Sequence, residues 1–261
     1  MFPASHFRYI LDISQAHSTT SITHRIYLPW GIRQFSGIMF SDGAPITTET
    51  AILASSLATS VVFGFIVRTP PGIFRLTMKT ASTALLSSLI FIRQGSSILG
   101  GALALGSLGD AFLAWDDDSE PAFLCGLSSF LVAHLLYIVE FLEVGSGYAR
   151  LQSDPRRILL VGILLLAVPA LNSKLMPKLE KGLRVSIMVY SAVIVSMCLS
   201  ALTLENELVV RGALLFATSD CILAIDRFLV APTSSHRPWM QYAVWILYYT
   251  GQYLIAQGLT G

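Results

Sequence analysis

The stretch that decides the fold is Ser-Ser-Ile-Leu-Gly-Gly-Ala-Leu-Ala-Leu-Gly-Ser-Leu-Gly-Asp-Ala-Phe-Leu-Ala-Trp, residues 96–115, which stops at three consecutive acids, residues 116–118. Its length matches the roughly 20 residues that a helix needs to cross a bilayer. A helix satisfies its own backbone hydrogen bonds, as a segment surrounded by lipid must. Asp110 is the charged residue within it. The stretch therefore predicts a membrane helix that carries one acid.

Similar apolar stretches lie on both sides of this one, separated by short polar breaks, and they comprise residues 51–67, 73–92, 121–142, 157–171, 182–204, 209–230 and 239–257. Together they predict an all-α fold, a polytopic membrane bundle of about eight transmembrane helices over residues 50–261. Residues 1–49 are rich in Ser, Thr and His and lack a long apolar core, so we expect a poorly ordered N-terminal extension. Lys and Arg divide almost evenly between the two sides, which leaves the orientation open.

The composition supports lipid as the solvent. Apolar residues make up 54% of the 261 residues and charged residues 13%, about half the ~25% typical of a globular domain. These values, with a mean hydropathy of +0.66, argue against a soluble enzyme. The net charge of +1 provides no basic field for nucleic acid. Cys125, Cys198 and Cys221 have spacings of neither a zinc site nor a disulfide framework and are interpreted as packing residues.

Two apolar stretches resemble each other. Gly-Asp-Ala-Phe-Leu-Ala-Trp-Asp from Gly109 aligns with Ser-Asp-Cys-Ile-Leu-Ala-Ile-Asp from Ser219, so that Asp110, Leu113, Ala114 and Asp116 match Asp220, Leu223, Ala224 and Asp226. The segments are four helices apart, which implies that they run in the same direction. The match predicts a 4+4 parallel repeat whose acids lie at similar depth in the membrane.

Asp110 and Asp220 are the leading functional candidates. A carboxylate inside a membrane helix costs a few kcal/mol, so it normally faces the protein interior or a wet cavity. Each acid follows a small residue, which permits close approach of a neighbouring helix or a ligand. The structural alternative is that each acid pairs with a buried cation such as Lys79 or Arg211, or is hydrated near the interface.

Further polar side chains occupy helical faces. His134 and Tyr137 are three residues apart and share one face. Trp245, Tyr248, Tyr249 and Gln252 follow at helical spacing, although an interfacial aromatic belt is the alternative for such a stripe. Lys79 has an acid or a phosphate as its expected partner. Phosphate-loop, dinucleotide, zinc-protease and serine-hydrolase motifs are missing, and with a single intramembrane His we expect neither a metal nor a cofactor.

These segments resemble the YhhN or TMEM86 family, the lysoplasmalogenase family of multi-span membrane proteins. The resemblance rests on residues 106–110, 123–141, 219–228 and 248–255 together with Lys79, and it covers most of the chain from about residue 50. Family members commonly have Lys-Pro on the second helix and Asn near the end of the seventh. Here Thr80 follows Lys79 and the second position is Asp226, so the chain departs from the family pattern at both positions.

The resemblance implies a membrane hydrolase that cleaves the vinyl ether bond of lysoplasmalogens, giving a fatty aldehyde and a glycerophospho-amine. This reaction needs a general acid and a group that stabilises an oxocarbenium ion, a division familiar from paired carboxylates. Asp110 and Asp220 are the expected catalytic pair, in either order. Lys79, His134, Tyr137, Tyr249 and Gln252 are expected to position substrate and water.

Two other functions fit the same residues. A lipid or small-solute transporter would use a parallel repeat and intramembrane acids. A non-catalytic membrane protein would use the acids for helix assembly. The expected partners are a lysophospholipid substrate and the lipid bilayer, and a homodimer is left open. In a eukaryotic source, we expect the endoplasmic reticulum or another internal membrane.

Overall fold

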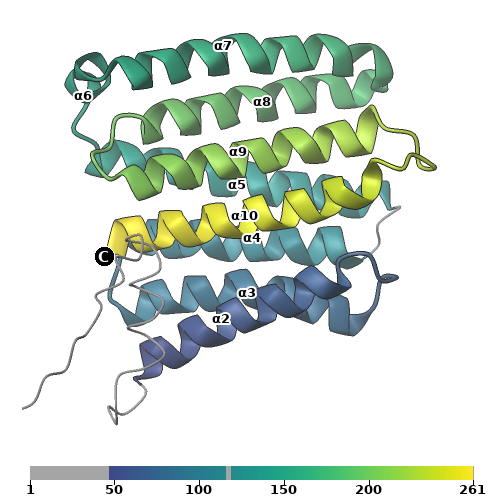
Figure 1. Cartoon of the computed structure of the whole chain (residues 1–261), viewed down its shortest axis with the longest axis horizontal. Coiled ribbons are helices and arrows are strands. Elements are labelled where there is room, and N and C mark those ends of the chain that lie inside the picture. The colour runs from purple at the N-terminus through teal and green to yellow at the C-terminus, as the bar shows by residue number, and fades with distance from the viewer. Residues whose placement is uncertain (1–46, 116–118, 261) are drawn as a thin grey trace, which may run out of the picture. The chain divides into compact units, whose positions relative to one another are not determined.

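The computed structural model describes residues 47–115 and 119–260, and its regular elements in these ranges are all helices (Figure 1). They are α2 (Thr48–Ile66), α3 (Ile73–Ile92), α4 (Ser97–Trp115), α5 (Glu120–Val144), α6 (Tyr148–Ser153), α7 (Pro155–Leu175), the 3₁₀ turn η1 (Met176–Lys178), α8 (Lys181–Ala201), α9 (Glu207–Phe228) and α10 (Arg237–Thr260). The eight long helices of these ranges coincide with the eight apolar stretches to within a few residues. The predicted extension, residues 1–49, lies almost entirely outside the described residues.

Short polar residues set where the helices begin. Thr47 caps α2 by accepting a hydrogen bond from the backbone N–H of Thr50. Ser119 caps α5 and Asp154 caps α7, and in both helices a proline occupies the first turn. A cap satisfies an otherwise unpaired N–H, and proline is tolerated there because it has none to lose. The local sequence therefore fixes these helix starts independently of packing.

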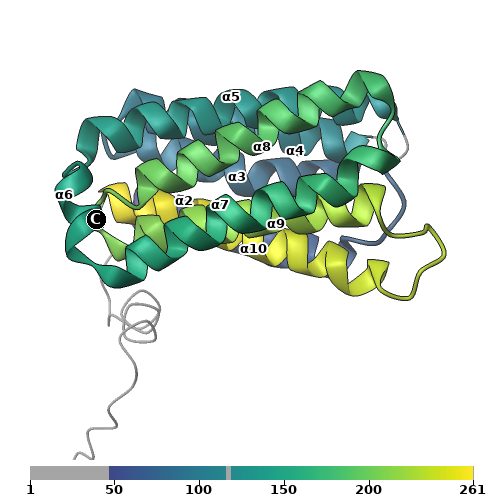
Figure 2. The ribbon, with the colours of Figure 1, turned by 90° about the horizontal axis from the view of Figure 1, so that it is seen from above.

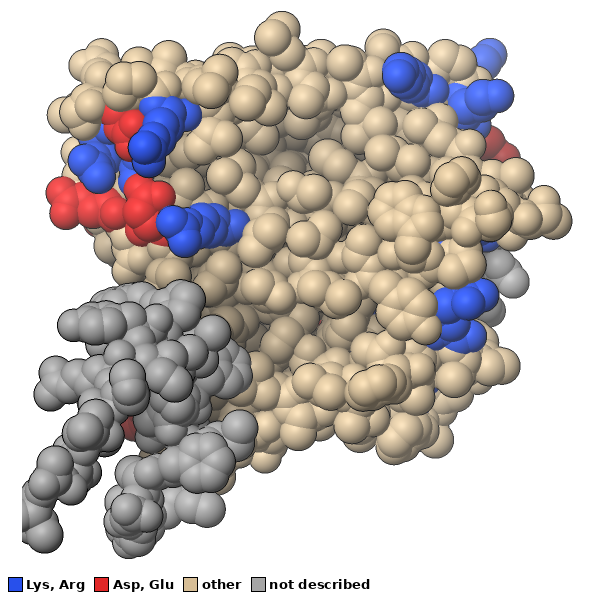
Figure 3. Space-filling view, viewed as in Figure 1, with Lys and Arg blue, Asp and Glu red and all other residues tan. Residues whose placement is uncertain are grey.

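The described helices identify a multi-pass membrane protein. Six of them are long and apolar enough to cross a bilayer: α2, α4, α5, α7 with η1, α8 and α9. The other two long helices, α3 and α10, do not meet that criterion, so the number of eight crossings stays a prediction. On the face shown in Figure 3, Lys, Arg, Asp and Glu gather at the two ends of the helices and leave a broad uncharged band between them.

Small residues let neighbouring helices come close. A Cβ atom added to Gly212 of α9 would lie 2.7 Å from the carbonyl oxygen of Gly251 of α10, and one on Gly251 would lie 2.8 Å from that of Gly212. On α4, a Cβ on Gly109 would lie 2.7 Å from the ring of Phe130 of α5. In a membrane, close packing of this kind drives association because lipid is as apolar as the side chains. The glycines thus bring α4 against α5 and α9 against α10.

Helix α7 lies at the edge of the bundle beside α8 (Figures 1 and 2). Its buried residues are Arg157 near its start and Leu175 at its end. The Arg157 guanidinium is 2% exposed and donates to the carbonyls of Leu202 and Leu204 at 2.7 and 2.5 Å, and to the Glu207 carboxylate at 2.5 Å. These bonds satisfy carbonyls at the end of α8 and attach α7 to the turn before α9.

Helices α4 and α9 run in the same direction in Figure 1, as the internal match implies. Of the two further acids in that match, Asp226 forms an ion pair with Arg237, with 3.0 Å between Oδ1 and Nε, and Asp116 lies outside the described residues. A common direction also results from any even number of crossings. The 4+4 repeat therefore remains a prediction.

Candidate active site

Asp110 and Asp220 line one cavity. It has a volume of about 460 Å³, and its wall comes mainly from α9 and α10, with contributions from α2, the loop after it, α3, α4 and α5. Besides these two acids, its polar and aromatic lining comprises Phe63, Arg68, Thr69, Arg75, Lys79, Phe123, Phe130, Ser219, Asp226, Arg227, Arg237, Gln241, Trp245 and Tyr248. The expectation that intramembrane carboxyls face a cavity thus holds for both acids.

Asp110 lies among three donors from two helices. Its side chain is 2% exposed, and Lys79 Nζ lies 3.5 Å from Oδ1. The hydroxyls of Tyr248 and Thr83 donate to Oδ2 at 2.8 and 3.0 Å. Lys79 and Thr83 are one helical turn apart on α3, so a single face of that helix presents both to the acid. The alternative pairing of Asp110 with Lys79 is therefore present, and it stabilises a carboxylate at this position.

Asp220 has different partners. The Tyr190 hydroxyl from α8 donates to its Oδ2 at 2.9 Å. His134 from α5 places Nε2 at 3.4 Å from the same oxygen, and its side chain is fully buried. Asp220 therefore contacts Tyr190 and His134, and not the cation Arg211 that was its expected alternative partner. Asp220 is thus bordered by a hydroxyl and an imidazole, whereas Asp110 is bordered by an ammonium.

The hydrogen bonds of His134 locate a proton. Its Nδ1 lies 2.6 Å from the backbone carbonyl of Phe130. A carbonyl can only accept, so we infer that Nδ1 carries a hydrogen and that Nε2 faces Asp220. The approach of Nε2 to a carboxyl oxygen is favourable when a proton lies between them, on either the imidazole or the carboxyl. The His134–Asp220 pair is therefore suited to hold one shared proton.

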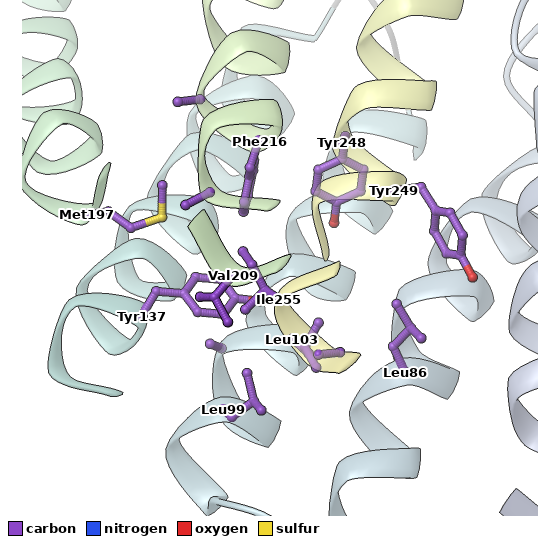
Figure 4. Packing of buried hydrophobic residues seen from close by; sticks show 14 of the residues in the cluster. Leu86, Leu99, Leu103, Tyr137, Met197, Val209, Phe216, Tyr248, Tyr249 and Ile255 are labelled. Atoms are coloured by element: carbon purple, nitrogen blue, oxygen red, sulfur yellow. The ribbon is translucent and has the colours of Figure 1, made fainter. Parts of the chain in front are cut away.

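Aromatic rings connect the surroundings of the two acids. The ring of Phe216 on α9 lies 5.3 Å from that of Tyr248 and 4.6 Å from that of His134. Phe130 lies 5.7 Å from Tyr248 and 6.2 Å from Phe216, in edge-to-face geometry with each. Figure 4 shows Phe216 beside Tyr248, with Tyr249 on the far side of Tyr248. This packing gives the groups that contact the acids a fixed spacing.

Comparison with known proteins identifies the family. The sequence pattern of the YhhN family matches residues 74–259, well over half of the chain. The chain belongs to the YhhN family. Lys79, Asp110, His134 and Asp220 all lie within the matched residues.

Curated relatives of this YhhN protein carry one name. The human protein "Lysoplasmalogenase TMEM86B" is 31% identical over 160 residues, which cover 61% of this chain and 62% of the human protein. The mouse protein of the same name is 33% identical over 166 residues, covering 62% and 63% of the two chains. The match thus spans a little under two thirds of the human and mouse proteins. No solved structure gives a significant match.

Three residues expected at the site of this YhhN protein lie elsewhere in the bundle. The Tyr137 hydroxyl donates to Gln252 Oε1 at 2.5 Å, and both side chains are fully buried. The Tyr249 hydroxyl lies 2.7 Å from Ser56 Oγ on α2. None of these three is among the residues that line the described cavity. The stripe on α10 therefore divides, with Trp245 facing the cavity and Gln252 facing α5.

The sequence also left cavity residues of this YhhN protein unidentified. Tyr248 belongs to the aromatic stripe on α10 but is not among the residues expected at the site. Tyr190 contacts Asp220 from outside the cavity lining, and its local sequence does not indicate this partner because Asp220 belongs to another helix. Arg68, Arg75, Arg227 and Arg237 lie at or near helix ends, where basic residues are ordinary. Position in three dimensions is what distinguishes them.

Among the residues that the structure describes, no group of three or more His, Cys, Asp or Glu side chains is placed to hold a metal ion. The titratable groups that line the cavity are three carboxyls, one ammonium, one tyrosine hydroxyl and four guanidinium groups, and the imidazole of His134 lies behind Asp220. This set can transfer protons, stabilise a cation and bind an anion.

Proposed function

We propose that this protein is a membrane-embedded hydrolase that cleaves the vinyl ether bond of lysoplasmalogens, with a fatty aldehyde and a glycerophospho-amine as products. The relatives named lysoplasmalogenase support this substrate class. The observation that carries the chemistry is the meeting of two carboxyls on one cavity, Asp110 with a side chain 2% exposed and Asp220 with a side chain 9% exposed. Paired carboxylates are a recurring solution for hydrolysing bonds through an oxocarbenium ion.

The reaction consumes one water and needs one proton to be transferred to carbon. Protonation of the alkenyl carbon distant from the ether oxygen moves the double-bond electrons and leaves an oxocarbenium ion. Water adds to that ion and loses a proton, which gives a hemiacetal. Collapse of the hemiacetal breaks the bond to the glycerol oxygen, so an aldehyde and a free glycerol hydroxyl result. A site for this reaction must supply a proton and stabilise a nearby positive charge.

We assign these two tasks to different acids. A proton held between Asp220 and His134, whose Oδ2 and Nε2 atoms are 3.4 Å apart, would make this pair the general acid. Asp110 is held beside Lys79 and accepts from two hydroxyls, which favours its carboxylate form, so it stabilises the oxocarbenium ion and orients water. Lys79 thereby acts on the reaction through Asp110.

Tyr137, Tyr249 and Gln252 are proposed to act indirectly. Their bonds join α10 to α5 and α2, and Tyr248 lies on the same helix. They therefore position Tyr248, and hence its bond to Asp110, rather than contacting the substrate. Their loss should raise the flexibility of α10 at the cavity.

We also propose that α3 and α10 cross the membrane as the remaining two of eight spans. Each is at least 20 residues long. Their polar residues, including Lys79 and Arg237, line the cavity, so these groups can be kept from lipid. In a eukaryotic source we place the protein in the endoplasmic reticulum or another internal membrane, where lysophospholipids enter from the bilayer.

The test is aldehyde release by the purified full-length chain. A vinyl ether lysolipid and its saturated ether analogue, with equal chain and head group, are incubated with the protein in detergent. We expect aldehyde from the vinyl ether and none from the saturated analogue. Absence of aldehyde from the vinyl ether, with the protein folded and monodisperse, would overturn the proposal. Transport without aldehyde formation in vesicles would instead support a lipid carrier.

A further inference from the structure

The cavity that contains the two acids has a cationic end. Arg68 follows α2, Arg75 lies in the first turn of α3, Arg227 in the last turn of α9 and Arg237 at the start of α10, and all four line it. These positions share the end of the bundle at the right of Figure 1. Guanidinium groups match the geometry of phosphate oxygens, and the ends of membrane helices lie at the level of lipid head groups.

The described lining at this end is rich in guanidinium groups. Its acid is Asp226, which pairs with Arg237, the Nε and Oδ1 atoms being 3.0 Å apart. Arg227 also lies over the ring of Phe123, 5.1 Å from its centroid. The described residues here thus comprise four guanidinium groups and one carboxylate. Lys79, deeper in the cavity, is engaged with Asp110.

A second, mostly apolar cleft adjoins the cavity. It has a volume of about 60 Å³ and lies among α4, α5, α7, α8 and α9, with an aliphatic lining that includes Leu127, Leu171, Leu175, Ile187 and Ile194. The cavity and the cleft share five wall residues: Leu113, Phe123, Phe130, Asp220 and Leu223. Asp220 is therefore the carboxyl at the boundary between polar and apolar space. Asp110 lines the polar cavity and is not among the residues of the cleft.

The outer wall of the apolar cleft belongs to a lightly packed helix. α7 contributes Val168 and Leu171 to the cleft, and its buried residues are near its two ends. The middle of α7 exposes large apolar side chains, such as Leu166, which is 75% exposed. A hydrocarbon chain in this cleft would therefore lie next to the bilayer from which it comes.

We infer that one lysophospholipid lies across the cavity and the apolar cleft, with its phosphate against the four arginines and its hydrocarbon chain passing through the cleft toward the bilayer beside α7. This inference rests on the proposed function and deepens it. In such a lipid the ether bond lies between the phosphate-bearing glycerol and the chain. The orientation therefore brings the ether bond to Asp220, which is consistent with proton donation by Asp220 and with Asp110 acting from the polar side.

Binding of saturated ligands tests the phosphate half of this orientation. Tritiated hexadecyl-glycerophosphocholine and hexadecylglycerol, which have equal chains and cannot be cleaved by vinyl ether hydrolysis, are titrated against the full chain in nanodiscs. We expect at least tenfold tighter binding of the phosphate-bearing ligand, reduced to threefold or less in Arg75→Gln and Arg227→Gln. The matched control is Arg156→Gln, an exposed arginine at the opposite end of the bundle.

Inorganic phosphate separates a head-group site from a free-anion site. At millimolar concentration it should leave hexadecyl-glycerophosphocholine bound. Full displacement by phosphate alone, or equal affinity of the wild-type protein for the two ligands, would overturn the inference. These binding measurements need no turnover. Failure of aldehyde release would therefore refute the proposed function without deciding the orientation of the bound lipid.

The length of the ligand's hydrocarbon chain tests the part of the inference that concerns the apolar cleft. Ala224 lines the cleft, so Ala224→Phe should weaken binding of the hexadecyl ligand at least tenfold and that of an octyl ligand less than threefold. Ala224→Leu provides a milder variant in case the phenylalanine prevents folding, with a smaller shift in the same direction. Leu166→Phe on the exposed side of α7 is the control. Unchanged chain-length preference in a folded Ala224 variant would overturn this orientation.

Discussion

Asp110 and Asp220 occupy matching positions in two similar sequences, yet their surroundings differ. Asp110 has an ammonium at 3.5 Å and two hydroxyl donors. Asp220 has one hydroxyl donor and an imidazole at 3.4 Å. A fixed cation favours a permanent carboxylate, whereas an imidazole can share a proton. Equivalent sequence thus leads to unequal chemistry, because the neighbours of each acid come from other helices.

The largest expected effect is that of Asp220→Asn, since an amide can neither hold nor deliver the proton. Aldehyde release should fall by about 10²–10⁴-fold, the usual contribution of a general acid. The rate is measured at saturating vinyl ether lysolipid. Thr218→Ala, an exposed position on the same helix, serves as control. Turnover of Asp220→Asn within threefold of wild type would remove this acid from the mechanism.

Lys79→Met tests the ion pair at Asp110. Because the Asp110 side chain is 2% exposed, loss of its cation leaves a buried charge and should reduce the free energy of unfolding by about 3–5 kcal/mol. The double variant Lys79→Met, Asp110→Asn should regain most of that stability but not the activity. Unfolding is followed by tryptophan fluorescence in detergent. Wild-type stability of the single variant would show that Asp110 is not a buried carboxylate.

The tyrosines that contact the acids allow a direct comparison of the two positions. A hydrogen bond to a charged group contributes about 1.5–3 kcal/mol and one between neutral groups about 0.5–1.5 kcal/mol. Tyr248→Phe should therefore reduce the free energy of unfolding by about 2 kcal/mol and Tyr190→Phe by about 1 kcal/mol. Tyr242→Phe, at a 39% exposed residue of α10, is the control. A larger loss for Tyr190→Phe would reverse our assignment of the charges.

The smallest expected effect is that of Thr83→Val, which removes one of two hydroxyl donors to Asp110 Oδ2 and keeps the shape of the side chain. With Tyr248 still in place, we expect a loss of about 0.5–1 kcal/mol in unfolding free energy. Thr77→Val, six residues earlier on α3 and exposed, controls for the loss of a hydroxyl from this helix. A loss as large as that of Tyr248→Phe would mean that Thr83 is the principal donor.

Much of the helical layout could be predicted because its causes are local. Each apolar stretch must become a helix to satisfy its backbone in lipid, and caps such as Ser119 and Asp154 mark the starts. Asp110 and Asp220 could be selected because a carboxyl in an apolar helix is costly wherever it lies. Gly109 could be identified as a packing position because a small residue permits close approach of a neighbouring helix, and the ring of Phe130 lies against it.

The partners of these acids could not be derived in this way. Tyr190 and His134 precede Asp220 by 30 and 86 residues and lie on other helices. No local sequence pattern predicts that these side chains contact Asp220. Tyr137 and Gln252 were expected beside the substrate, yet they bond to each other between α5 and α10. Helical periodicity gives the face that a residue occupies but not the neighbour that the face meets.

The sequence by itself determined that this protein is an all-helical membrane protein of the YhhN family with two intramembrane acids, because hydropathy and charge act locally along each helix. The tertiary structure alone decided that Lys79 joins Asp110, that His134 joins Asp220, and that four arginines border the same cavity. Those contacts depend on the rotation and depth at which helices pack, and packing is set by many side chains together.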